Sequence, residues 1–374
     1  MSTKALLRAF CAGAVAVASG AALAQSEPLS VKIGVLTDLS SLYADTNGTG
    51  SVTAARMAVE DYRAAGGTVK AEIVSADHQN KPDVGSVVTR EWFDQGGVDA
   101  VVDVPNSAVA LSVTELARQK NKVFMNSGAS SSDFTGKYCS PNSIHWTYDT
   151  YALATGTSRA VVAAGGDTWY LLTADYAFGH TMEADIRKIL AATGGTVKGS
   201  ARTPLNTADF SSFLLQAQAS KAKVVGLVNA GGDTINSIKQ AAEFGIAQGG
   251  QKIAAMVLYI TDVHSLGLTV AQGLQFTAAY YWDLNDGTRT FAKRFGERMG
   301  GRMPTQLHAG AYSATLHYLK AVEKAGTKTD GKRVVEVAKS LPTEDGVFGK
   351  GTIRPDGRKM HSMYLFETKT PSES

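Results

Sequence analysis

Small polar residues and tyrosines follow each stretch of this sequence that has the pattern of a buried β-strand. These runs contain almost no Lys, Arg or His; they are 37–43, 105–107, 127–131, 174–176, 230–233 and 259–262. Hydroxyls and free backbone N–H groups at helix starts can hold a small organic anion, and tyrosine rings can form its walls. Capping of the following helix explains Asn106, Ser131 and Asp233 at least as well. Tyr43 and Tyr176 are expected to face a cleft, because a tyrosine at a loop tip does no capping.

The motifs of several other chemistries are missing. There is no Gly-x-x-x-x-Gly-Lys-Ser/Thr run, no Gly-x-Gly-x-x-Gly after the first strand, no Gly-x-Ser-x-Gly elbow and no His-Glu-x-x-His. The seven histidines are scattered along the chain. His308 and His317 fall on opposite sides of one predicted helix, so they cannot share a metal ion. We therefore expect neither a metal ion nor a cofactor.

Alternating strand and helix patterns must position the polar loops. Residues 31–126 alternate β-branched runs with amphipathic stretches, and the pattern restarts over 151–279, with a last strand at 273–279. Such alternation with short joins predicts right-handed βαβ units and parallel sheets covered on both faces. The predicted fold class is α/β with two doubly wound parallel-sheet lobes. Ligands bind such sheets beyond the carboxyl ends of the strands, which is where the polar loops lie.

The C-terminal part breaks this alternation. Helical patterns at 288–299, 306–325 and 331–340 precede two short β runs, 351–353 and 362–367. This is too little for a third domain, so we expect it to return and complete the first two. Repeated crossing between two lobes makes a hinge, and a hinge makes a cleft that can close. The predicted boundaries are 25–144 plus 281–345 for lobe 1 and 145–280 plus 346–374 for lobe 2.

The N-terminus has the pattern of a secretory signal peptide. Lys4 and Arg8 precede an apolar run, 10–22, which ends in Ala-Leu-Ala at 22–24. Cleavage after residue 24 leaves 374 − 24 = 350 residues, and losing two cations takes the formal charge from +3 to +1. A net charge this close to zero gives no indication of a basic surface that binds nucleic acid. We expect a periplasmic protein without membrane insertion after cleavage, and without an intrachain disulfide, because only Cys139 remains.

Several segments resemble the type I periplasmic binding proteins, in the branch of the branched-chain amino acid (Leu/Ile/Val-type) receptors of ABC importers. The resemblance covers nearly the whole mature chain, and its segments are VKIGVLTDLS (31–40) followed by YAD (43–45), GSVTAARMAVED (50–61), FMNSGASS (124–131) and DYAFG (175–179). It implies two lobes joined by a three-stranded hinge, with a ligand trapped by closure. It also implies a membrane ABC permease as partner.

The resemblance also implies binding roles for individual residues. Asn106 and Ser107 match a loop that contacts the ligand carboxylate. Gly128 and Ser130 match a backbone-plus-hydroxyl pair on the same group. Tyr176 matches a tyrosine that closes the cleft. The expected site also includes other residues of these loops, namely Leu42, Tyr43, Ser127, Ala129, Asn229, Ala230, Asp262 and Tyr281.

One departure from the family pattern concerns the ligand. Amino acid receptors of this family usually place an acidic residue after the strand at 252–258, where it pairs with the ligand ammonium. Here that loop has no glutamate, and Asp262 could instead cap the next helix. Because a buried ammonium without a partner charge is costly, this departure speaks against an α-amino acid, and Tyr43 and Tyr176 favour an aromatic carboxylate such as a benzoate- or cinnamate-like acid. Tyr281 and Trp282 could add a stacking wall or pack in the hinge.

We therefore expect a periplasmic solute-binding component of an ABC transporter that captures a small carboxylate, either an aromatic acid or a branched-chain or aromatic amino acid. One alternative is an exported α/β enzyme that uses Asp38, Asp175 or His264, although no nucleophile and base lie at a recognisable spacing. Another alternative is the ligand-sensing domain of a receptor.

Overall fold

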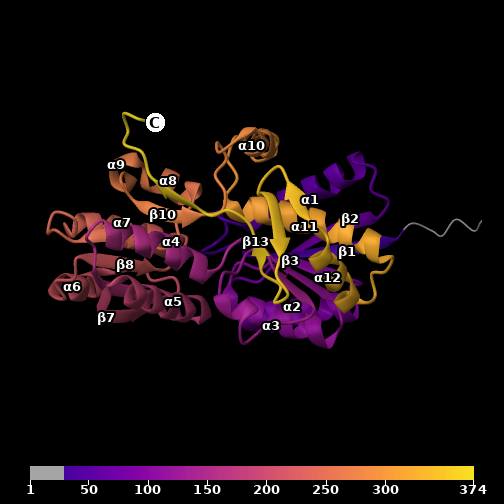
Figure 1. Ribbon diagram of the computed structural model, residues 1–374, viewed down its shortest axis with the longest axis horizontal. Coiled ribbons are helices and arrows are strands. Elements are labelled where there is room, and N and C mark those ends of the chain that lie inside the picture. The colour runs from indigo at the N-terminus through magenta and orange to yellow at the C-terminus, as the bar shows by residue number, and fades with distance from the viewer. Residues whose placement is uncertain (1–28) are drawn as a thin grey trace, which may run out of the picture.

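The computed structural model describes residues 29–374, which form two lobes side by side along the long axis of the molecule (Figure 1). The predicted signal peptide, residues 1–24, lies outside the described residues. No helix of residues 29–374 combines the length and the apolar character that a membrane span requires. The two-lobe α/β fold predicted from the sequence is confirmed.

The first lobe is built on a parallel sheet with the strand order β2-β1-β3-β4-β5. Its elements are β1 (Ser30–Thr37), α1 (Gly48–Ala64), β2 (Lys70–Asp77), α2 (Pro82–Asp94), β3 (Ala100–Asp103), α3 (Ser107–Gln119), β4 (Val123–Asn126), the 3-10 helix η1 (Ser132–Thr135), β5 (Ser143–His145), α10 (Asp286–Arg298), α11 (Gln306–Ala325) and α12 (Gly331–Ser340). Every residue of β3 and β4 is buried, as expected for strands covered on both faces. α2 and α3 pack on one face, and α1, α11 and α12 pack on the other.

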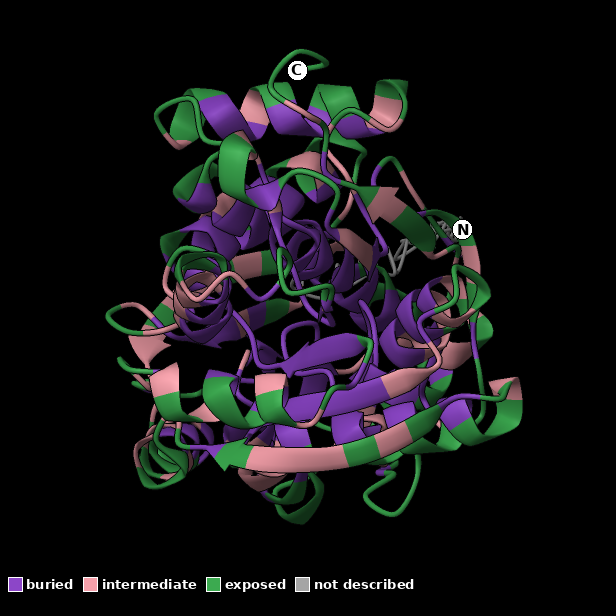
Figure 2. Cartoon of the chain, turned by 90° about the vertical axis from the view of Figure 1, so that its left-hand side faces the viewer, coloured by how far each residue is buried: buried purple, intermediate pink, exposed green. Residues whose placement is uncertain are grey.

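The second lobe repeats this architecture around the strand order β7-β6-β8-β9. Its elements are α4 (Thr150–Ala163), β6 (Thr168–Ala174), α5 (Ala177–Thr193), β7 (Thr196–Thr203), α6 (Ser211–Ala219), β8 (Val224–Val228), α7 (Gly232–Glu243), β9 (Lys252–Ala255), α8 (Ile260–Leu266) and α9 (Leu268–Ala271). Seen from this lobe, the central strands are buried and the helices expose their outer faces (Figure 2). The sequence pattern did not distinguish the short elements β5, α8 and α9.

The C-terminal strands differ from the prediction in two ways. The predicted strand 273–279 forms as β10 (Gln275–Ala278), but it pairs antiparallel with β14 (Tyr364–Glu367) in a separate two-stranded sheet. A small sheet of β11 (Thr343–Asp345), β12 (Gly349–Ile353) and β13 (Lys359–Met360) precedes β14. Short apolar runs do not reveal which partner strand they meet, so the sequence could not separate these sheets.

The chain crosses between the lobes three times. The first crossover follows β5, where Trp146 packs in the first lobe and Tyr148 in the second. The second follows β10, and the third joins β13 to β14. The third lies later than predicted, because Val347, Phe348 and Ile353 pack in the core of the first lobe. We therefore propose boundaries of 29–146 plus 279–360 for the first lobe and 149–278 plus 364–374 for the second.

A buried histidine fixes helix α11 against helix α1. His308 Nδ1 accepts the N–H of Thr305, 3.1 Å away, and its Nε2–H donates to the carbonyl of Asn47 at 2.9 Å. This arrangement requires the neutral ring, and burial lowers the pKa of His308 to about 4. Gly50 leaves room for the ring, since a Cβ there would lie 2.3 Å from His308 Nε2.

Replacing His308 with Gln tests this arrangement. The folded-state pKa lies below the ordinary value of 6.5, so the unfolded chain binds more protons between pH 6.5 and 4, and the wild type loses stability as the pH falls through that window. The stability advantage of the wild type over His308→Gln is expected to shrink by about 2 kcal/mol between pH 7 and pH 5 in urea unfolding. The exposed His180→Gln serves as the control. An equal pH dependence in both variants would contradict the prediction.

Candidate ligand-binding cleft

Asp38 organises the loop that carries Tyr43. Its carboxylate accepts the backbone N–H groups of Ser41 at 2.9 Å and Tyr43 at 2.8 Å. The Asn80 amide donates to the same carboxylate at 2.6 Å. Because these donors occupy the carboxylate, Asp38 acts here as a loop anchor, and the Tyr43 ring is held at the edge of the first lobe that faces the second.

Tyrosine hydroxyls from the two lobes meet in pairs. The hydroxyl of Tyr43, after β1, lies 2.7 Å from that of Tyr176, which precedes α5 of the second lobe. Beside them, Tyr148 of the first crossover donates to the Gly128 carbonyl at 3.0 Å, and its oxygen lies 3.0 Å from the Tyr259 hydroxyl. These pairs hold the two lobes in a closed arrangement.

Burial keeps these phenols neutral. It raises the pKa of Tyr148 to about 12. Burial also raises the pKa values of Tyr43 and Tyr259 well above the ordinary value, and the neighbouring phenols add to the effect. At neutral pH each group is therefore a hydroxyl that can both donate and accept a hydrogen bond.

The tyrosines surround a small cavity between the lobes. Four of the residues predicted from the sequence line it: Tyr43, Ser130, Tyr176 and Ala230. The other lining residues come from both lobes and the first crossover; they are Thr46, Asn47, Pro105, Tyr148, Phe178, Val257, Tyr259 and Leu307. The cavity measures about 20 Å³, which is room for one water molecule. An organic ligand therefore needs a wider separation of the lobes than the one seen here.

Contacts at the rim hold the lobes in the same arrangement. Ser131 Oγ lies 2.9 Å from the Thr181 hydroxyl, and the Ser132 hydroxyl donates to Asp185 at 2.9 Å. The carbonyl of the predicted residue Leu42 accepts the N–H of Gly232, from the second lobe, at 3.4 Å. Leu42 thus lies at the contact between the lobes.

Three of the predicted polar residues form hydrogen bonds within their own loop or with the helix that follows it. Asn106 caps α3 by accepting the N–H groups of its first turn. The amide of Asn229 bonds to Thr234 and Ser237. Asp262 accepts the Tyr259 N–H at 3.0 Å, which makes it the helix cap that the sequence left as one possibility. None of the three lines the cavity.

The remaining predicted residues lie outside the cavity lining. The Gly128 N–H donates to the Asp103 carbonyl, and the Ala129 N–H donates to Asn126. Ser107 and Ser127 are buried, and their hydroxyls have no hydrogen-bond partner in the described residues. Tyr281 lines a different pocket, near the hinge.

Asp233 is a site candidate that sequence reasoning set aside as a helix cap. It does not cap α7; its Oδ2 accepts the Asn206 N–H at 3.1 Å, and its buried Oδ1 has no partner in the described residues. Burial raises the pKa of Asp233 to about 6. Its charge also contributes to the raised pKa values of Tyr43 and Tyr176, although Asp233 does not line the cavity in the closed form.

Strained backbone lies beneath the cleft. Asp103 and Val104, at the end of β3, have φ angles of 80° and 63°. A β-branched residue rarely adopts this conformation, and such strain gathers at binding sites. The Asn47 amide donates to Asp103 at 2.6 Å, and burial raises the pKa of Asp103 to about 6. These contacts support the loops that carry Asn47 and Pro105 to the cavity.

The residues considered for catalysis are dispersed. Asp38 is engaged by its own loop. Asp175 lies 2.8 Å from His180 at an exposed position. His264 lines the pocket near the hinge. None of the three lines the cavity between the lobes, and the described residues contain no cluster that could hold a metal ion.

The comparisons with known proteins agree with this geometry. The family model of the periplasmic binding proteins matches residues 30–373. The chain belongs to the periplasmic binding protein family. A periplasmic binding protein of Burkholderia mallei is 49% identical, with 92% of this chain and 91% of that chain covered and a TM-score of 0.89. No curated protein sequence matches the chain.

Two further structures show how widely ligands differ within this fold. A branched chain amino acid ABC transporter periplasmic ligand-binding protein of Burkholderia xenovorans is 44% identical, with 92% and 91% of the chains covered and a TM-score of 0.79. A solute binding protein of an R. palustris ABC transporter, in complex with benzoate, is 19% identical, with 91% and 93% covered and a TM-score of 0.81. At that identity the likeness concerns the fold alone. The chain is thus a solute-binding protein of the two-lobe type.

Replacing Tyr176 with Phe tests the contact between the lobes. The Tyr43 hydroxyl would then be buried without a partner in the closed form, so closure is expected to weaken by about 1 kcal/mol, or roughly fivefold in the closed-to-open ratio. Small-angle scattering should show a larger radius of gyration. The double variant Tyr43→Phe with Tyr176→Phe should close better than either single variant, because no hydroxyl is left unpaired. Tyr151→Phe, at an exposed position, is the control.

Proposed function

We propose that this periplasmic binding protein is the solute receptor of an ABC importer, that residues 1–24 direct its export, and that it captures a small acid with an apolar side group. The observation that carries the proposal is the meeting of Tyr43 and Tyr176, from opposite lobes, beside Ser130. The relative from Burkholderia xenovorans supports the transport role. The dispersal of Asp38, Asp175 and His264 speaks against a catalytic step.

The proposed mechanism is a shift between open and closed forms. A ligand between the lobes contacts residues of both only when they are closed, so its binding free energy favours closure. Ser130 and the neutral phenols offer hydrogen-bond donors for a carboxylate. Phe178, Val257 and Leu307 offer apolar surface for a side group. The membrane permease would recognise the closed form that this ligand stabilises.

Asp233 favours an α-amino acid as the ligand. Its buried, unpartnered oxygen is costly, and a ligand ammonium would both satisfy that oxygen and compensate the charge. Asp233 would thus pair with the ligand ammonium, as the acidic residue usually does that amino acid receptors of this family have in the loop where Asp262 lies here. A plain aromatic acid would bring a second carboxylate near Asp233 without compensation. We therefore propose a branched-chain or aromatic amino acid ahead of a benzoate-type acid.

Thermal unfolding with added ligands tests the receptor function. Leucine, phenylalanine, benzoate and 4-hydroxybenzoate are added in turn, and binding to the native state raises the melting temperature. We expect a rise with the amino acids. A rise with the benzoates alone would overturn the ammonium role of Asp233. No rise with any of these acids would contradict the proposed ligand class.

Asp233→Asn tests the ammonium contact directly. Removing the charge is expected to weaken amino acid binding about 30-fold or more in calorimetry, because the ligand ammonium would be buried without its counter-charge. Asp209→Asn, an exposed acid, is the control. Unchanged amino acid affinity in Asp233→Asn would contradict the role.

The same contact predicts a pH dependence of binding. The pKa of Asp233 is raised to about 6, and only the ionised carboxylate attracts an ammonium. Amino acid affinity in the wild type is therefore expected to fall as the pH drops below 6, by up to tenfold per pH unit. In Asp233→Asn this dependence should disappear. A wild-type affinity that stays constant from pH 7 to pH 5 would contradict the prediction.

A further inference from the structure

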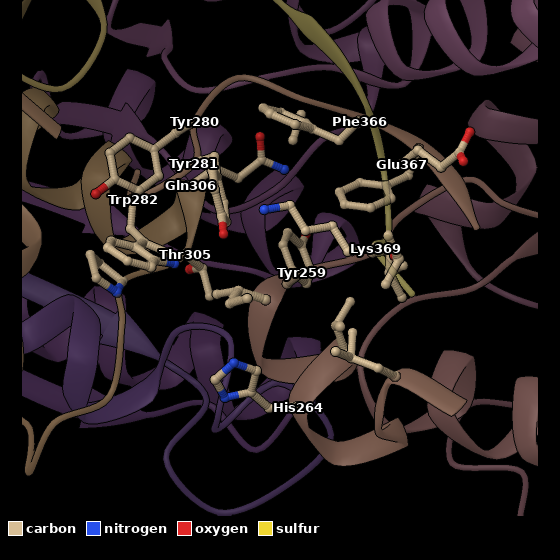
Figure 3. A pocket seen from close by; sticks show the side chains of 18 of the residues that line it. Tyr259, His264, Tyr280, Tyr281, Trp282, Thr305, Gln306, Phe366, Glu367 and Lys369 are labelled. Carbon is tan, nitrogen blue, oxygen red and sulfur yellow. The ribbon is translucent and has the colours of Figure 1, made fainter. Parts of the chain in front are cut away.

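A second, larger cavity lies beside the hinge, and we refer to it as the hinge pocket. Its walls come from α8 of the second lobe, the second crossover at 280–282, the segment 304–306 at the start of α11, and the C-terminal residues 366–369 and 374 (Figure 3). It measures about 710 Å³, within the usual range for pockets that enclose small molecules. It shares only Tyr259 with the cavity between the lobes.

Aromatic side chains form most of the apolar wall. The Tyr281 ring lies 5.7 Å from Trp282 and 5.8 Å from Phe366, measured between ring centres. Phe276 lies 5.9 Å from Phe366 on the same wall. Rings at these separations leave faces and edges for a further ring to pack against. The wall thus suits a flat aromatic group.

Gln306 and Lys369 present donor groups to the hinge pocket. Gln306 is 3% exposed, and its Oε1 accepts the Ala279 N–H at 2.8 Å. This bond fixes the amide so that its NH2 group points into the cavity, toward the amine of Lys369 (Figure 3). The NH2 group donates to no acceptor in the described residues, so it is available to a ligand in the pocket.

Lys369 forms no ion pair in the described residues, but its charge helps to lower the pKa of Glu373, and the C-terminal Ser374 lines the same pocket. The neighbouring Glu367 also lines the pocket, and its carboxylate accepts the Gln275 amide at 2.8 Å. A cationic amine and an amide NH2 group converge on one end of an aromatic pocket, and an anionic acceptor is the group that satisfies both.

We propose that the hinge pocket is a second small-molecule site, which takes an aromatic monocarboxylate. The carboxylate binds between Lys369 Nζ and Gln306 Nε2, and the ring packs against Tyr281 and Phe366. This site goes beyond the proposed capture of a solute between the lobes. It differs from that cleft in its size, in its walls and in having a lysine among its lining residues.

The experiment uses 2-naphthoate as the probe, titrated into the full mature chain by calorimetry. Lys369→Gln removes the charge and keeps a polar side chain that is one atom shorter, and it is expected to weaken naphthoate binding about tenfold. Lys239→Gln, which removes an equal charge from the exposed face of α7, should bind like the wild type. 2-Naphthamide, which lacks the negative charge, should bind the wild type and Lys369→Gln with equal, weaker affinity.

Asp233→Asn separates the two sites. Naphthoate affinity is expected to stay within twofold of the wild type in that variant, whereas amino acid binding falls. Naphthoate binding that responds to Asp233→Asn and not to Lys369→Gln would place the probe in the cleft and overturn the proposal. Equal binding by Lys369→Gln and Lys239→Gln, or no binding by the wild type, would overturn it as well. Circular dichroism confirms that each variant is folded.

Discussion

The closed arrangement of this protein depends on how buried phenol groups satisfy one another. A buried hydroxyl without a partner is costly, and Tyr43 and Tyr176 supply that partner from opposite lobes. The second pair, Tyr148 and Tyr259, extends the same contact to the first crossover. Because each pair spans two parts of the fold, separating the lobes exposes these hydroxyls to water at the same time. Closure and hydrogen bonding are therefore one event, which is what a receptor that traps its ligand requires.

The rest of the structure holds those phenols in place. Asp38 holds the loop after β1 by accepting its backbone N–H groups. The strained backbone of Asp103 and Val104 directly precedes the loop that carries Pro105. The two sheets are covered on both faces, so their strands shift little as the lobes move. Movement is left to the crossovers, where the hinge pocket lies. The same architecture thus provides rigid loops and a movable junction.

Much of the fold and part of the cavity lining could be predicted from the sequence, because the patterns that indicate them are local. Alternating strands and helices predicted both sheets, and the carboxyl ends of strands predicted Tyr43, Ser130, Tyr176 and Ala230 at the cavity. Tyr148 and Leu307 were missed because they lie on a crossover and on a helix turn, where no strand-end pattern marks them. Their place depends on how distant segments pack.

Asp233 and Asp262 show most clearly what could not be predicted from the sequence. Asp233 and Asp262 both lie in the first turn of a helix, and the sequence gives them the same pattern. Only the loop geometry decides that Asp262 bonds to its own helix start, while Asp233 keeps one oxygen free. The boundary proposed from the structure differs from the expected one at 345 for a related reason. Short β runs do not show which core they join.

The first turn of α11 ties three parts of the molecule to one piece of backbone. Gln306 holds the second crossover through Ala279, Leu307 lines the cleft, and His308 fastens α1 through Asn47. Successive residues of a helix point about 100° apart, so three consecutive side chains of one turn reach the second crossover, the cleft and α1. Inserting a single residue into this turn would rotate each of the three side chains by about 100°, toward the contact that its neighbour makes now. This turn should therefore tolerate changes in length far less than the glycine-rich stretch at 300–301 that precedes it.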